Sequence, residues 1–81
     1  MTRDHALHAV TTVLLDIAPD VDLQAIDPSA RLRDEADIDS MDFLKLLTGL
    51  KERTGVEVPE QHYEQVTSLD GLLACLVGRG G

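Results

Sequence analysis

Apolar residues recur at helical spacing in three segments of this chain, and this periodicity restricts the fold more than any other sequence feature. A helix turns by about 100° per residue, so residues three and four apart share one face. We therefore predict helices over Thr2–Ala18 and Ser40–Thr54, and a last helix from Thr67 or Ser68 to about Val77. The residues expected to face a core are Ala6, Val10, Val13, Leu14 and Ile17, with Leu7 widening this stripe; Phe43, Leu46, Leu47 and Leu50; and Leu69, Leu72, Leu73 and Leu76.

Two connections join these helices. Pro19–Asp39 lacks sustained periodicity and contains Pro28, so it reads mainly as a long loop. The second connection is an extended link over Val56–Pro59 and a brief helix over Pro59–Gln65. Thr67 and Asp70 have the spacing of a capping box for the last helix. Apolar residues of the first loop are expected to attach it to the core: Val21, Leu23, Ile26 and Leu32.

The length and composition favour one small helical domain covering residues 1–81. Phe43 and Tyr63 are the only aromatic residues, which suits helices better than a sheet sandwich. We predict an all-α fold: a small antiparallel-type bundle of three main helices and one short helix, with a long first loop.

The formal charge of -8, from 15 acidic and 7 basic residues, limits the partners that the chain attracts. It disfavours nucleic acid and anionic membranes and favours basic protein surfaces, although acidity also serves solubility alone. The single cysteine, Cys75, excludes an internal disulfide and is expected to be buried and inert. Because no signal peptide or membrane-length apolar run is evident, we expect a soluble, cytoplasmic protein. We also expect it to be a monomer.

Within Asp34–Leu44, an acidic loop leads to Ser40, and Ser40 opens an amphipathic helix. This pattern has an ordinary structural explanation, because serine is a good helix N-cap and aspartates near a helix start stabilise its dipole. Met41, however, falls nearly opposite the apolar arc of the helix, and Leu44 lies at the edge of that arc. We expect Met41 to be exposed, as methionines at adaptable binding surfaces are.

Asp39-Ser40-Met41 resembles the Asp-Ser-Leu attachment motif of acyl carrier proteins. The likeness extends to the order of the helix from Ser40, the Gly55–Pro59 link, the acidic Glu60–Gln65 segment and Val66–Leu69. The opening helix and the long acidic loop also agree, so the resemblance covers essentially the whole chain.

The resemblance implies a carrier protein rather than an enzyme. A phosphopantetheinyl transferase would attach 4′-phosphopantetheine from coenzyme A to the Ser40 hydroxyl, and the thiol of the arm would hold an acyl group as a thioester. Acyl-loading and acyl-processing enzymes with basic docking patches would then meet the carrier in turn. The predicted partner interface is Asp39, Met41, Asp42, Leu44, Lys45 and Thr48. The candidate lining for an acyl chain is Phe43, Leu46, Leu47 and Leu50, whose main role is core packing.

The chain departs from the usual pattern of the family at a few positions. Ile38 stands where a small residue is more common, and Met41 replaces leucine. Lys45 stands where carriers of fatty acid synthesis usually have an acid, and Lys51 adds another positive charge. These departures favour a specialised fatty acid or polyketide-type pathway. An aminoacyl or peptidyl carrier is an alternative, as is an unmodified acidic helical module that binds a basic partner.

No catalytic or metal site is predicted. Asp34, Asp37, Asp39 and Asp42 lack the spacing of a calcium-binding EF-hand loop. His5 and His8 have no evident third ligand. Ser40 is flanked by aspartates rather than by a base and a glycine-rich nucleophile elbow, so autonomous catalysis is not expected.

Overall fold

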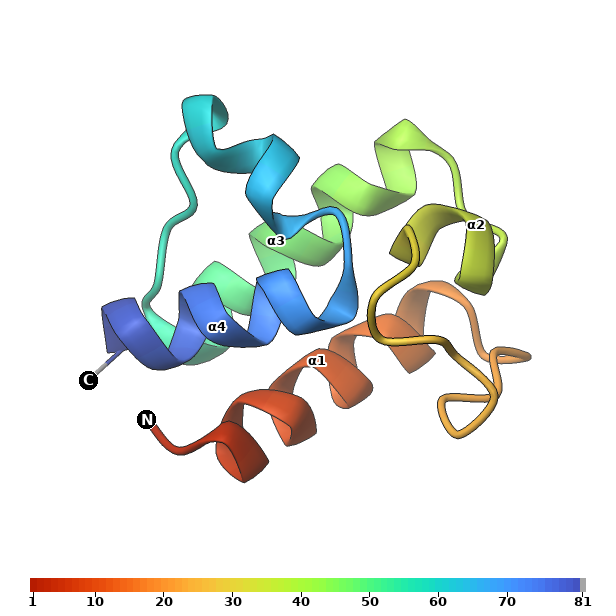
Figure 1. Cartoon of the computed structure of the whole chain (residues 1–81), viewed down its shortest axis with the longest axis horizontal. Helices are drawn as coiled ribbons and strands as arrows, with labels where there is room; N and C mark the ends of the chain where they lie inside the picture. The colour runs from red at the N-terminus through yellow and green to blue at the C-terminus, as the bar shows by residue number, and fades with distance from the viewer. Residues whose placement is uncertain (81) are drawn as a thin grey trace.

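Four α-helices and one 3₁₀ helix account for most of the chain in the computed structural model, which describes residues 1–80 and the side chains of residues 1–78. The elements are α1 (Arg3–Ile17), α2 (Leu32–Ala36), α3 (Ser40–Thr54), the 3₁₀ helix η1 (Glu60–Val66) and α4 (Leu69–Gly80). α1 runs opposite to α3 and α4 and packs against both, while η1 packs on α4 (Figure 1). The all-α bundle predicted from the sequence is confirmed.

The three predicted apolar stripes meet in one continuous core. All the core-facing residues predicted in α3 and α4 are buried, and so are those of α1 except Ile17, which is half-buried, and Leu7. The prediction for Leu7 was wrong, because its side chain is 39% exposed. The buried face of α1 widens toward Ala9 instead, on the opposite side of the stripe.

The helix ends are set by capping hydrogen bonds. Thr2 caps α1, accepting from the His5 N–H at 3.2 Å, and Gly55 ends α3 in the left-handed conformation with φ 75°. Ser68 caps α4, accepting from the Gly71 N–H at 3.0 Å. The predicted capping box was wrong: the Thr67 hydroxyl donates to the Glu64 carbonyl, and the Asp70 N–H donates to the Pro28 carbonyl.

The first connection contains a helix that the sequence did not predict, α2, whose five residues are too few to show a period. As predicted, apolar residues attach the first connection to the core: Ile26 and Leu32 are buried, and Val21 and Leu23 pack against the core. The Leu32 N–H donates to the Thr67 carbonyl at 2.7 Å, and the Asp70 N–H donates to the Pro28 carbonyl at 2.9 Å. Backbone hydrogen bonds therefore tie this connection to the junction between η1 and α4.

Two glycines permit close approaches between helices. A Cβ on Gly49 of α3 would lie 2.6 Å from Val13 Cγ1 of α1. A Cβ on Gly71 of α4 would collide with the Gln65 carbonyl oxygen of η1.

Cys75 is half-buried against the core, less enclosed than predicted. No helix in residues 1–80 has the length and apolarity needed to cross a membrane.

Candidate functional site

Ser40 is the first residue of α3, and its hydroxyl is exposed. The helix cap is the preceding residue: Asp39 Oδ1 accepts from the Asp42 N–H at 2.8 Å. The Ser40 hydroxyl forms no hydrogen bond with any described residue. The explanation of Ser40 as a helix cap was therefore wrong, because Asp39 performs that function and leaves the serine oxygen available.

A tight turn between α2 and α3 places this serine. Asp37 ends α2 with φ 55°, a left-handed conformation that aspartate tolerates better than most residues do. The N–H groups of Asp37 and Ile38 both donate to the Arg33 carbonyl. Ile38 is buried in the core. Anchored in this way, the chain turns outward at Asp39 and Ser40.

The outer face of α3 carries the predicted interface. Met41 is 69% exposed and Leu44 is 47% exposed, as expected from their angular positions. These two residues, with Lys45 and Thr48, line an open groove of about 370 Å³. The sequence analysis missed Glu52 in this groove, although its position seven residues after Lys45 places both on one face.

Asp39 and Asp42 lie at the serine end of the same helix, where Asp39 is exposed and Asp42 is half-buried. The two lysines of α3 differ in their electrostatic surroundings. Lys51 Nζ lies 3.5 Å from Glu57 Oε1, whereas Lys45 forms no ion pair with a described residue. Lys45 therefore presents an unpaired positive charge beside the exposed Met41 and Leu44.

A second cavity, of about 390 Å³, opens beside Ser40 between α2, α3 and η1. Its apolar residues Phe43 and Leu44 come from α3. Of the four residues predicted to line an acyl chain, Phe43 lines this cavity and Leu47 lines a neighbouring cavity of about 210 Å³. Leu46 and Leu50 are buried and line neither. The other residues around the cavity are Arg33, Glu60, Tyr63, Glu64 and Thr67, which the sequence analysis did not assign to the site.

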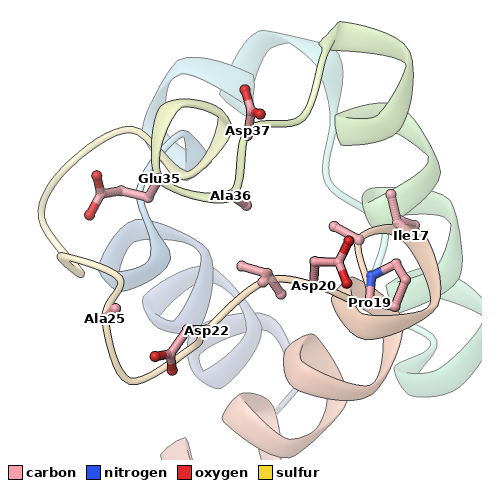
Figure 2. Close-up of a pocket in the computed structure, with 10 residues that line it drawn as sticks. Ile17, Pro19, Asp20, Asp22, Ala25, Glu35, Ala36 and Asp37 are labelled. Carbon is pink, nitrogen blue, oxygen red and sulfur yellow. The ribbon is translucent and has the colours of Figure 1, made fainter.

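An acidic pocket of about 570 Å³ lies on the other side of α2, against the end of α1 and the first connection. Figure 2 shows the carboxylates of Asp20, Asp22, Glu35 and Asp37 distributed around it, with Glu35 pointing away. Glu35 is already engaged, since it accepts from the Asp27 N–H at 2.6 Å. Among the described residues, no group of three or more histidine, cysteine or acidic side chains is arranged to hold a metal ion.

These features define a small helical protein with an accessible serine at a helix start, and comparison with known proteins identifies the family. Residues 8–76 match the family described as phosphopantetheine attachment site, and the chain belongs to it. The chain is 29% identical over 70 residues to an acyl carrier protein of Rubrobacter xylanophilus, a match that covers 86% of this chain and 85% of the relative. It is 27% identical over 73 residues to an acyl carrier protein of Thermosynechococcus vestitus, covering 90% and 89%.

The resemblance noted in the sequence is thus confirmed. The protein is a member of the acyl carrier protein family, a carrier rather than an enzyme, and its cofactor is 4′-phosphopantetheine. Carriers of this kind work with a phosphopantetheinyl transferase and with enzymes that act on the attached group.

The structure accommodates such a cofactor at Ser40. The hydroxyl is exposed and unbonded, so a phosphodiester can form there without breaking a helix cap. The Asp42 N–H is engaged by Asp39, but the N–H groups of Ser40 and Met41 at the start of α3 have no acceptor among the described residues and suit a phosphate. The adjoining cavity offers apolar side chains to the uncharged part of the arm.

Proposed function

We propose that this chain carries acyl groups as thioesters on a 4′-phosphopantetheine arm attached to Ser40, in a specialised fatty acid or polyketide-type pathway. The observation that carries this proposal is the state of the three serines. The Ser29 hydroxyl donates to Asp27 Oδ1 at 2.8 Å, and the half-buried Ser68 caps α4. Only the Ser40 hydroxyl, among these three, is exposed and without a hydrogen-bond partner in the described residues.

The chemistry asked of this residue is simple. On the transferase, the Ser40 oxygen forms a bond to the phosphorus that carries pantetheine, and the bond from this phosphorus to the bridging oxygen of the pyrophosphate breaks. The nucleotide part of coenzyme A leaves with that oxygen, and the hydroxyl proton passes to a base of the transferase. The carrier contributes access and a helix start that favours the new phosphate. It contributes no base, which agrees with its role as a substrate of the transferase.

The outer face of α3 is the proposed surface for partner enzymes. Asp39 and Asp42 beside the serine favour partners with basic residues there, and the exposed Met41 and Leu44 supply apolar contact. Lys45 belongs to the same proposed surface. Because its positive charge is unpaired among the described residues, it favours partner enzymes that place a carboxylate within an otherwise basic patch. Thr48 completes the surface at the far side of the groove. We further propose that the protein acts as a cytoplasmic monomer.

The test is co-expression with a broad-specificity phosphopantetheinyl transferase, followed by intact-mass measurement. Wild-type protein should gain the mass of one phosphopantetheine, and Ser40→Ala should gain none. Ser29→Ala is the matched control, since it removes another exposed serine hydroxyl and should be modified like the wild type. An unmodified wild type, or modification that survives Ser40→Ala, would reject the proposal and favour an unmodified interaction module.

A further inference from the structure

We propose that the guanidinium of Arg33 binds the phosphodiester on Ser40 and directs the arm along the cavity between α2, α3 and η1. This inference rests on the attachment of the arm to Ser40 proposed above. It assigns a binding role to a residue of α2, the helix that the sequence did not predict.

The charge distribution around the cavity carries the argument. Arg33 is the one cationic residue among those that line the cavity, and Ser40 lines it too. Arg33 is exposed and forms no ion pair with a described residue, so its guanidinium is available to a new anion. A guanidinium presents a planar fork of donors that matches the oxygens of a phosphate.

The backbone fixes Arg33 relative to the serine. Its carbonyl accepts from the N–H groups of Asp37 and Ile38, which form the turn that leads into α3. Arg33 is thus part of the structure that positions Ser40, although six residues lie between them in the sequence. The guanidinium is therefore carried on a segment whose main chain is hydrogen-bonded to the turn that leads to the attachment point.

The polarity of the cavity also gives the arm a direction. Glu60 and Glu64 of η1 line the cavity and repel a phosphate, which therefore favours the side of Arg33. Phe43 and Leu44 offer an apolar surface to the uncharged remainder of the arm. The volume of about 390 Å³ is within the range of small-molecule pockets, about 300–1,000 Å³. The arm would then rest against the surface of the bundle between encounters with partners.

The experiment compares holo wild type, Arg33→Gln and Arg31→Gln at low salt. Arg31 is the matched control, because it is exposed and lies two residues away but does not line the cavity. In wild type and Arg31→Gln, the ³¹P resonance of the phosphodiester should differ from that of the same protein unfolded in urea. In Arg33→Gln it should move toward the unfolded position. An unchanged resonance in Arg33→Gln, or an equal change in Arg31→Gln, overturns the inference.

A second measurement needs no substitution. The Nε–Hε resonance of Arg33 should move downfield between the apo and holo forms, while that of Arg31 stays in place. A stationary Arg33 resonance in protein whose mass shows full modification overturns the Arg33 contact and leaves the proposed function intact. Absence of any mass gain rejects both, so the two failures are distinguishable.

Discussion

Gly71→Ala offers a quantitative test of how η1 is seated on α4. Alanine is favoured over glycine inside a helix by about 1 kcal/mol and by less in the first turn, where Gly71 lies, so the substitution would slightly stabilise an unobstructed helix. Here the new Cβ meets the Gln65 carbonyl oxygen, which belongs to the backbone of η1 and cannot rotate away. Overpacking of this kind costs about 1–3 kcal/mol, and an obstructing backbone atom places the cost at the upper end. The net expectation is destabilisation by about 1–2 kcal/mol.

Thermal and urea unfolding of Gly71→Ala and Gly78→Ala provide the assay. Gly78 is in the same helix, and a Cβ there meets nothing within 4 Å. Gly78→Ala should therefore leave stability unchanged or raise it by a few tenths of a kcal/mol, because it lies near the helix end. In a domain of this size, each kcal/mol corresponds to about 4–8 °C in Tm. If Gly71→Ala melts at or above the wild-type temperature, the close approach of η1 to α4 is wrong.

Three further substitutions test the interface, the turn and the acid dependence. Met41→Glu should slow modification by the transferase while changing stability by less than about 0.5 kcal/mol, because Met41 is exposed. Leu15→Glu, on an exposed position of α1, is its control, and equal rates for the two variants would exclude the proposed surface. Asp37→Gly should stabilise the protein by about 0.5–1 kcal/mol in urea titrations, because glycine adopts φ 55° without strain; a lower urea midpoint would contradict this. Hydrogen bonds from the backbone and the side chain of Ser29 hold the pKa of Asp27 below its ordinary value of 3.8, so its stabilising effect is complete above that pH and is lost as the pH falls through the folded-state pKa. The stability difference between wild type and Asp27→Ala should accordingly shrink below about pH 3.8, and a difference that grows on acidification would reject this assignment.

The sequence predicted the long helices well because each repeats an apolar pattern over several turns. α3 begins and ends where predicted, and α1 differs by one residue at each end. α2 was missed because its five residues complete little more than one turn, too short for a pattern to repeat. Pro59–Gln65 was predicted as a brief helix, and the structure has a 3₁₀ helix one residue further along.

The site was predictable in part, for a different physical reason. Angular position on one helix was enough to predict that Met41 is exposed and that Phe43 is buried. The choice of helix cap was not, because Asp39 and Ser40 are both good caps and the turn after α2 decides between them. The cavity beside Ser40 could not be predicted from residue spacing either, because its walls come from three separate segments of the chain.

The backbone hydrogen bond from Leu32 to Thr67 has a mechanical consequence for the cavity. It joins the first residue of α2 to the residue that follows η1, so a main-chain contact links the two walls that face α3. If the cavity takes up cargo as proposed, we expect a larger cargo to move α3 relative to these two walls, through the turn at Asp37–Asp39 and the link at Val56–Pro59. Amide hydrogen exchange should become faster with cargo length at these two hinges, while the Leu32 amide remains equally protected.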